Sequence, residues 1–227
     1  MTDELLPIFL NLTGRMVVLV GGGRVAAGKL HQLLAAGARV RVIAPDVSSA
    51  VVDGVGGGAP RVDIVPRAFV PADLDSAWLV VAAATPAVNR QVADACEKRH
   101  LFVNAVDDPG NASAFLSGVV RRDGVTVAIS TSGDAPALTS LLREALDAVL
   151  PRDLAAWMAR ARTERIAWKR DGIAMDDRKP RLLQALNELY PSPKAPRRKE
   201  QRAAPEDAAQ DSSPAFPWLH GPEDSWL

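Results

Sequence analysis

The sequence comprises 227 residues, of which 48% are hydrophobic and 24% charged, a composition typical of a soluble globular protein with a sizeable core. Its formal net charge of zero argues against a nucleic-acid binder that depends on attraction to phosphates. The single cysteine, Cys96, excludes an internal disulfide and a cysteine-rich metal site, and it fits a reducing cytoplasm. We expect no signal peptide, because the N-terminus is acidic, and no membrane span, because the longest apolar run covers only residues 77–84.

Short runs rich in Val, Ile and Leu predict buried strands, and helical patterns separate several of them. The predicted strands cover residues 15–20, 39–44, 61–65, 78–83, 101–106 and 125–130, and the clearest helices cover residues 25–36 and 86–99. Strands without polar alternation, interleaved with helices, indicate an α/β fold whose parallel sheet is covered on both faces. We assign this sheet to a domain of residues 1–112, in which the glycine-rich residues 53–60 form a flexible loop.

A different pattern begins after residue 112. Two β-runs meet at Asp123-Gly124, which is a strong signal for a hairpin. A helix follows, for which we expect Asp134 as the cap, Pro136 in the first turn and Pro151 at the end. This helix carries an apolar stripe made of Leu138, Leu141, Leu142, Leu146 and Val149. Residues 113–150 therefore form a hairpin–helix module.

The last part of the chain divides into a helical domain and a tail. Residues 151–190 predict two helices, the first with an inward face of Leu154, Trp157, Met158 and Ala161. Residues 191–227 contain seven prolines among 37 residues, which is the composition of a disordered tail. Aromatic residues in this tail leave a docking motif as the alternative.

A glycine-rich corner stands between the first predicted strand and the first predicted helix. Gly21, Gly23 and Ala26 fit the spacing of a dinucleotide-binding turn, with Gly22 between the first two. Such a turn brings backbone amides and a helix N-terminus to a pyrophosphate, so we predict a Rossmann-like, dinucleotide-binding domain. Asp46 lies 25 positions after Gly21, where a carboxylate binds ribose hydroxyls and favours NAD over NADP. The alternative is that the glycines serve packing only.

A second polar cluster follows the fifth predicted strand, in residues 101–115. It contains Asn104, Asp107, Asp108 and Asn111. In a parallel sheet, the carboxyl ends of the strands meet at one edge, which places this cluster on the same side as the glycine corner. A carboxylate facing a nicotinamide can accept a proton while hydride leaves the substrate. An ordinary Asp-Asp-Pro turn is the alternative.

Four motifs, in this order, carry a family resemblance: "LPIFLNLTGRMVVLVGGGRVAAGKLHQLLAAGARVRVIAP", "WLVVAAAT", "VNAVDDPGNASAF" and "VAISTSGDAPALTSLLRE". They resemble the N-terminal region of siroheme synthases, a family of precorrin-2 dehydrogenases, some of which are also sirohydrochlorin ferrochelatases. The resemblance covers residues 5 to about 190. It implies NAD-dependent oxidation of precorrin-2 to sirohydrochlorin, with Fe²⁺ as the metal substrate in members that also make siroheme. It further implies a homodimer built through the module of residues 113–150.

The resemblance also implies roles for particular residues. The catalytic aspartate of the family falls on Asp107, which would serve both reactions. The cofactor-binding positions fall on the glycine corner and on Arg24, Val25, Pro45 and Asp46, and Ser132 falls in the tetrapyrrole cleft. The loop after Asn104 is slightly longer than the commonest family form, which leaves open whether Asp107 or Asp108 faces the cleft. The methyltransferase domain of trifunctional synthases is not expected, so methylation would occur on another protein.

The substrate and the metal allow further expectations. Because a tetrapyrrole bears many carboxylates, it needs cationic neighbours, and we expect substrate contacts from Asn104, Arg121, Arg162 and Arg165 besides Ser132. Three scattered histidines form no ligand cluster, so no metal site is predicted. Two competing hypotheses remain: a non-catalytic module that senses NAD, and a chelatase without dehydrogenase activity.

Overall fold

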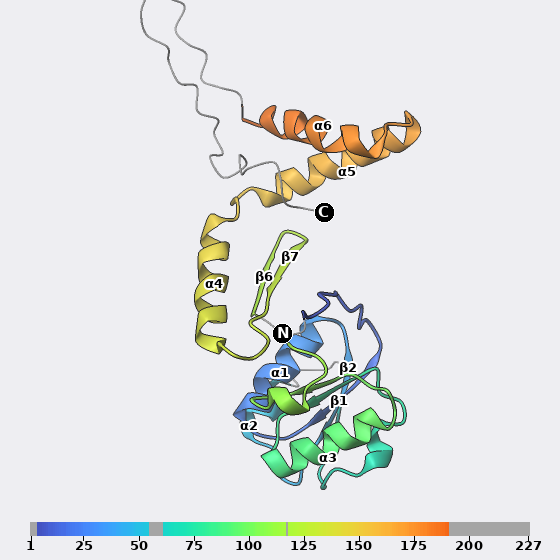
Figure 1. Ribbon diagram of the computed structural model, residues 1–227, viewed down its shortest axis with the longest axis vertical. Helices are drawn as coiled ribbons and strands as arrows, with labels where there is room; N and C mark the ends of the chain where they lie inside the picture. The colour runs from blue at the N-terminus through green and yellow to red at the C-terminus, as the bar shows by residue number, and fades with distance from the viewer. Residues whose placement is uncertain (1–3, 55–60, 117, 191–227) are drawn as a thin grey trace, which may run out of the picture. The chain divides into compact units, whose positions relative to one another are not determined.

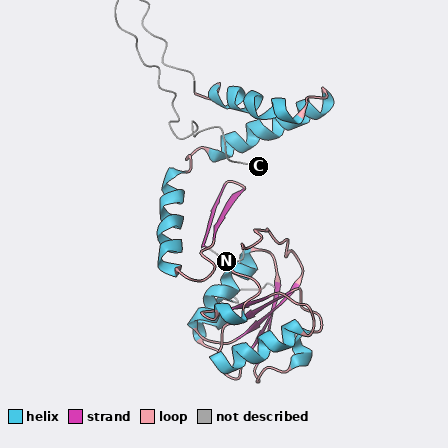
Figure 2. Cartoon of the chain, viewed as in Figure 1, coloured by secondary structure: helices cyan, strands magenta, loops and turns pink. Residues whose placement is uncertain are grey.

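The computed structural model describes residues 4–54, 61–116 and 118–190 (Figures 1 and 2). The predicted tail, residues 191–227, lies outside the described residues, as do residues 55–60 of the predicted loop. By its internal contacts the chain divides into two units, Met1–Gly172 and Ile173–Leu227. Within the described residues, no helix is both long and apolar enough to cross a membrane.

A five-stranded parallel sheet forms the first part of the chain, as predicted. Its strands are β1 (Met16–Val20), β2 (Arg39–Ile43), β3 (Val62–Val65), β4 (Leu79–Ala82) and β5 (Val103–Ala105). They lie in the order β3-β2-β1-β4-β5, and every neighbouring pair is parallel. This order has the crossover at β1 that is typical of a Rossmann-like domain.

Alternating strand residues supply two apolar cores, one on each face of the sheet. Val17 and Leu19 point into a core shared with α1 (Arg24–Ala35) and α2 (Ser49–Gly54). Val18 and Val20 point into a core shared with α3 (Pro86–Glu97). Burying each of these side chains stabilises the fold by roughly 1.5–3 kcal/mol, so the packing of helices on both faces of the sheet contributes strongly to stability. The sequence did not predict α2, which ends within the glycine-rich stretch expected to be a loop.

The register of the sheet brings the strand ends to one level. Val20 pairs with Ile43 on one side and with Ala82 on the other, and Ala82 pairs with Ala105. Neighbouring strands lie about 4.8 Å apart, so the ends of β1 and β5, with β4 between them, lie roughly 10 Å apart. The segments that follow β1 and β5 therefore leave the same edge of the sheet at a distance that one small molecule spans.

The hairpin after residue 112 consists of β6 (Gly118–Arg122) and β7 (Val125–Ile129). Its turn has positive φ at both central residues, 50° at Asp123 and 87° at Gly124, which is the backbone of a type I′ turn. The helix α4 (Pro136–Val149) runs alongside this hairpin (Figure 1).

The N-terminus of α4 differs from the prediction in one respect. Pro136 is in the first turn as expected, but Asp134 is not the cap, because the N-cap residue is Ala135. The Thr131 hydroxyl accepts a hydrogen bond from the Ala135 amide at 3.2 Å. A side chain from the preceding turn thus binds the amide before the helix, and the carboxylate of Asp134 is left exposed.

Two helices follow, as predicted, α5 (Leu154–Arg170) and α6 (Met175–Asn187). On α5, Leu154 is buried and Trp157, Met158 and Ala161 are half-buried, which confirms the expected inward face. The helix lies against the hairpin turn, because a Cβ built on Gly124 would be 3.9 Å from the Met158 methyl group. The boundaries at residues 112 and 150 stay predictions, since the contacts divide the chain only after Gly172.

Candidate functional site

Close backbone packing within the protein requires glycine at the first two positions of the corner, Gly21 and Gly22. Gly21 has a φ of +129°, and a Cβ there would clash with the carbonyl oxygen of Ala83, just after β4. A Cβ on Gly22 would clash with the backbone oxygen of Asp46, just after β2. These close approaches hold the backbone of the corner between the segment that follows β4 and the segment that follows β2.

Gly23 differs from its neighbours because nothing in the protein lies within 4 Å of a Cβ built on it. It is the N-cap residue of α1, and among the described residues no side chain caps this helix and no acidic residue occupies its first turn. The first N–H groups of a helix have no partner within the helix, and the helix dipole makes this end attractive to anions. An open N-terminus with space above a glycine fits the pyrophosphate of a dinucleotide.

The other predicted cofactor residues surround this corner. Arg24 and Val25 begin α1, and both side chains are exposed. Pro45 and Asp46 follow β2 and are also exposed, with the Asp46 backbone against Gly22. The Ser48 amide donates to the Gly22 carbonyl at 2.8 Å, which fixes this loop to the corner. The seven predicted cofactor residues thus lie on two adjoining segments.

The loop that carries the two aspartates is closed at its base by hydrogen bonds. Ser113 and Ala114 both donate their amides to the Val103 carbonyl at 2.9 Å, and the Ser113 hydroxyl accepts from the Val103 amide at 3.0 Å. Asn104, a predicted substrate residue, is only 6% exposed, and its Nδ2 donates to the Ala114 carbonyl. Its Oδ1 is buried without a hydrogen-bond partner among the described residues. The Asn104 amide therefore anchors the loop.

The two aspartates of this loop have different surroundings. The Asp108 carboxylate accepts a hydrogen bond from Asn111 Nδ2 at 2.8 Å, and so it stabilises its own turn. The Asp107 side chain is exposed, and its backbone has a φ of 56°, a left-handed conformation that costs roughly 1–3 kcal/mol outside glycine. Within the described part of the chain, no hydrogen bond occupies the Asp107 carboxylate. Of the two, Asp107 has the carboxylate available to a ligand.

The turn after β7 lies against the aspartate loop. Ser132 has a φ of 56° and Gly133 a φ of 89°, so the backbone doubles back here. A Cβ on Gly133 would be 3.3 Å from Pro109 and 3.5 Å from Phe115, both of which belong to the loop that follows β5. Ser132 is exposed at this turn. Two of the predicted site residues, Asp107 and Ser132, thus lie on segments in direct contact.

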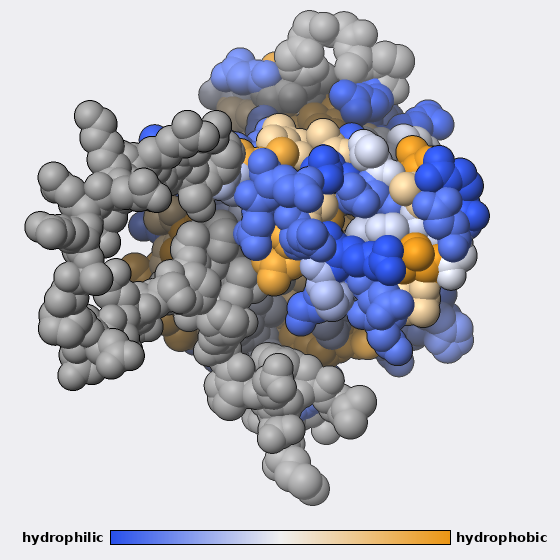
Figure 3. All heavy atoms as spheres, turned by 90° about the horizontal axis from the view of Figure 1, so that it is seen from above, coloured by the Kyte–Doolittle hydropathy of each residue, from blue (hydrophilic) through white to orange (hydrophobic). Residues whose placement is uncertain are grey.

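The three predicted substrate arginines belong to the hairpin and to α5. Arg121 is exposed at the end of β6, and Arg165 is exposed on α5. The Arg162 guanidinium lies beside the hairpin turn, with Nη2 3.7 Å from a Cβ built on Gly124. The described surface turned to the viewer in Figure 3 is mostly hydrophilic. The structure ties Arg162 to the hairpin turn, and within the described ranges no hydrogen bond or ion pair of these three arginines to the aspartate loop is found.

Lys29 is a residue near the site that the sequence analysis missed. It lies on α1 between the buried Ala26 and Leu30, and it is half-buried itself. Burial lowers the pKa of its ammonium group, and the opposing effect of the Asp107 carboxylate, which raises this pKa, is smaller. A lysine within the apolar stripe of a helix was the signal in the sequence, because that position is normally hydrophobic.

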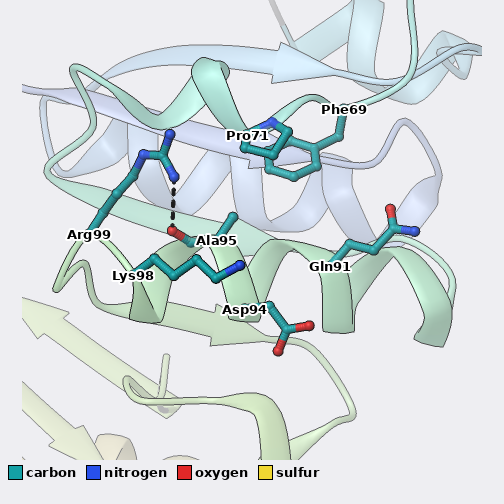
Figure 4. Close-up of a pocket in the computed structure, with 7 residues that line it drawn as sticks. All are labelled: Phe69, Pro71, Gln91, Asp94, Ala95, Lys98 and Arg99. Atoms are coloured by element: carbon teal, nitrogen blue, oxygen red, sulfur yellow. Dashed lines mark hydrogen bonds between the residues drawn. The ribbon is translucent and has the colours of Figure 1, made fainter.

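A shallow pocket of about 340 Å³ lies elsewhere, between α3 and the short 3-10 helix Pro71–Leu74 (Figure 4). Phe69 and Pro71 line one side, and side chains of α3 line the other. The Arg99 guanidinium in this pocket donates to the Ala95 carbonyl and to Asp75. The pocket contains none of the predicted site residues. Among the described residues, no group of three or more His, Cys, Asp or Glu could hold a metal ion.

Comparison with known proteins identifies relatives for most of the chain. Residues 8–118 match a family described as putative NAD(P)-binding. The siroheme synthase of Photorhabdus laumondii is 42% identical over 152 residues, which is 66% of this chain and 32% of the relative. Siroheme synthase 1 of Aeromonas salmonicida is 39% identical over 186 residues, 80% of this chain and 39% of the relative. The chain thus spans about a third of the length of these curated relatives.

A solved structure confirms the fold. The chain is similar to SirC, a precorrin-2 dehydrogenase, with a TM-score of 0.64 and 24% sequence identity. The alignment covers 82% of this chain and 92% of SirC. The order of a parallel sheet, an antiparallel hairpin and terminal helices is therefore shared along most of both chains.

Proposed function

We propose that this chain oxidises precorrin-2 to sirohydrochlorin with NAD⁺, because it belongs to the family of siroheme synthase N-terminal regions. The observation that carries this proposal is the common edge of the sheet. The open N-terminus of α1 follows β1, and the unoccupied carboxylate of Asp107 follows β5, two strands whose ends lie roughly 10 Å apart. Gly23 and the N-terminus of α1 would hold the pyrophosphate of NAD⁺, at the same edge of the sheet as Asp107.

In this mechanism Asp107 is the general base. The glycine corner would hold NAD⁺, which would supply the hydride acceptor for a carbon of the macrocycle. The oxidation also releases a proton from the macrocycle, and the Asp107 carboxylate is placed to accept it. The hydrogen bonds at Val103 and Asn104 fix the base of the loop that carries Asp107. Asp108 supports the loop through Asn111 and takes no proton.

Cofactor choice and substrate contacts follow from residues at the rim of the site. Asp46 is exposed beside the glycine corner, where it would bind ribose hydroxyls and repel a 2′-phosphate, which favours NAD over NADP. Ser132 would contact the macrocycle from the turn that touches the aspartate loop. Arg121, Arg162 and Arg165 would bind its carboxylates, because guanidinium groups pair with carboxylates in a forked geometry.

The decisive experiment compares the two aspartates. Purified protein is mixed with precorrin-2 and NAD⁺, and the absorbance spectrum reports the oxidation. We expect Asp107→Asn to lower kcat at least about a hundredfold, the usual contribution of a general base, while Asp108→Asn keeps most of the activity. Wild-type activity in Asp107→Asn would remove this residue from the mechanism.

The same assay separates the competing functions. A module that only senses NAD would bind the cofactor without any turnover of precorrin-2. A chelatase without dehydrogenase activity would insert Fe²⁺ or Co²⁺ into added sirohydrochlorin at a rate independent of NAD⁺. Metal addition after the oxidation shows whether the protein also catalyses chelation, with Fe²⁺ as its substrate. A cytoplasmic location stays a prediction from the single cysteine.

We also propose a homodimer through the hairpin–helix module. Thr139 and Arg143 on α4 lie against Gly118 of the hairpin, and Asp147 pairs with Arg122 at 2.6 Å. The apolar stripe of α4 lies outside these contacts with the hairpin. Its five residues are 39–63% exposed: Leu138, Leu141, Leu142, Leu146 and Val149. An amphipathic helix with its apolar side in water needs a partner surface. A second copy supplies one with the same chemistry.

A further inference from the structure

Asp107 lies between two residues whose positions are fixed by hydrogen bonds. Before it, the Val106 amide donates to the Ala82 carbonyl at 2.9 Å, and the Val106 side chain packs against the core shared with α1. After it, Asp108 is bound twice by Asn111. The Asn111 amide donates to the Asp108 carbonyl at 3.1 Å, and Asn111 Nδ2 donates to Asp108 Oδ2 at 2.8 Å. Asp107 is therefore an exposed residue between two anchored neighbours.

The backbone of Asp107 makes these anchors important. Its φ of 56° is a left-handed conformation, which a residue other than glycine keeps only where the surrounding structure imposes it. The side-chain bond between Asp108 and Asn111 closes the turn of residues 108–111 in addition to the backbone bond, and both residues are half-buried. Without the side-chain bond, the 3.1 Å backbone bond alone would hold this turn. Asp107 could then relax to a negative φ, and its carboxylate would change direction.

We propose that Asn111 is a positioning residue for Asp107. Its side-chain amide binds the Asp108 carboxylate and thereby holds Asp107 in the left-handed conformation that presents its carboxylate to the substrate. The role in catalysis rests on the proposed function. The restraint on the Asp107 backbone does not depend on that function, so it can be measured on the protein without substrate or cofactor.

Exchange of the two side chains supplies matched variants. Asn111→Asp places two carboxylates opposite each other, with no donor between them, and Asn111→Ala removes the bond without adding a charge. Asp108→Asn keeps an acceptor oxygen for Asn111. The double variant Asp108→Asn with Asn111→Asp again contains one amide donor and one carboxylate acceptor, so it should re-form the bond in the opposite direction. Asn187→Asp, at an exposed position of α6, makes the same charge change away from the loop.

The restraint is tested by ¹⁵N relaxation of the protein alone. We expect the Asp107 amide to have the order parameter of a rigid backbone in the wild type, about 0.85, and to fall below about 0.6 in Asn111→Asp. Asn111→Ala should give a similar loss of order. The exchanged pair should restore the rigid value, and Asn187→Asp should not change it. An Asp107 amide that stays rigid in both single variants of Asn111 would overturn the inference.

The catalytic role is tested by the kinetics of precorrin-2 oxidation. We expect Asn111→Asp to lower kcat at least about tenfold, because a misplacement of about 1 Å can cost a hundredfold, while KM and NAD⁺ binding stay nearly unchanged. The exchanged pair should recover most of this kcat. A kcat that the exchanged pair does not recover, or a loss confined to KM, would overturn the positioning role. If relaxation shows the restraint but the wild type does not oxidise precorrin-2, the proposed function fails instead.

Discussion

Gly23 and Gly28 both face open space, but only Gly23 lies where the cofactor should bind. We expect Gly23→Ala to change the free energy of unfolding by less than about 1 kcal/mol, because its φ of −83° suits alanine. It should weaken NAD⁺ binding at least about tenfold, since the methyl group enters the space of the pyrophosphate. Isothermal titration calorimetry and thermal unfolding measure the two effects.

Matched alanine variants at two other glycines complete this experiment. Gly28→Ala, in the exposed interior of α1, should stabilise the protein by roughly 0.5–1 kcal/mol and leave NAD⁺ binding unchanged. Gly21→Ala should destabilise the protein strongly, because its Cβ meets the Ala83 carbonyl. Normal NAD⁺ affinity in Gly23→Ala would show that the corner serves packing only.

At the scale of single elements, a buried carboxylate fixes the 3-10 helix Pro71–Leu74. Asp73 is only 6% exposed, and it accepts hydrogen bonds from Arg67 Nη2 at 2.6 Å, Arg67 Nη1 at 2.8 Å and the Val70 amide at 2.9 Å. We expect Asp73→Asn to cost about 1.5–3 kcal/mol of unfolding free energy at neutral pH, the usual value for such charged hydrogen bonds. Asp63→Asn, which breaks an exposed ion pair with Arg41, should cost less than about 1 kcal/mol.

The pH dependence of this effect has a definite sign. The hydrogen bonds from Arg67 lower the pKa of Asp73 in the folded state. Its contribution is therefore fully present above the ordinary aspartate pKa of about 3.9 and is lost as the pH falls through the folded value. In urea unfolding at a series of pH values, the difference between wild type and Asp73→Asn should narrow below about pH 4. A constant difference would mean that packing, not the charge, stabilises this helix.

Elements of this fold were predictable where hydrophobic pattern alone determines them. The strands of the sheet, α1, α3 and the Asp123-Gly124 turn all occur within a few residues of their predicted places. The cap of α4 was not predictable from spacing, because Thr131 reaches its backbone from a neighbouring turn. Nor could spacing distinguish Asp107 from Asp108, since the difference depends on a hydrogen bond from Asn111 and on the left-handed backbone of Asp107. The sequence predicted the segments of the proposed site, and tertiary contacts determine which of their side chains are available.

At the scale of the whole molecule, the sheet domain and the hairpin–helix module differ in how they bury apolar surface. The sheet has a complete core on each face, built from its own helices. The module has a two-stranded hairpin, which is marginally stable by itself, and a helix whose apolar stripe is exposed. We therefore expect the module to depend on a second copy and the sheet domain to fold without one.

A charge placed in the stripe of α4 tests this dependence. Leu141 is 63% exposed, so Leu141→Glu should be tolerated within one chain, but in a dimer it would bury an unpaired carboxylate. We expect the wild type to have twice the 24.2 kDa mass of one chain in light scattering, and Leu141→Glu to weaken the dimer at least about a hundredfold. Ala137→Glu, an exposed position of α4 outside the stripe, should remain dimeric. Because the proposed cofactor site lies on the sheet domain, the monomeric variant should still bind NAD⁺. A monomeric wild type, or an unchanged dimer in Leu141→Glu, would show that the stripe is not the dimer interface.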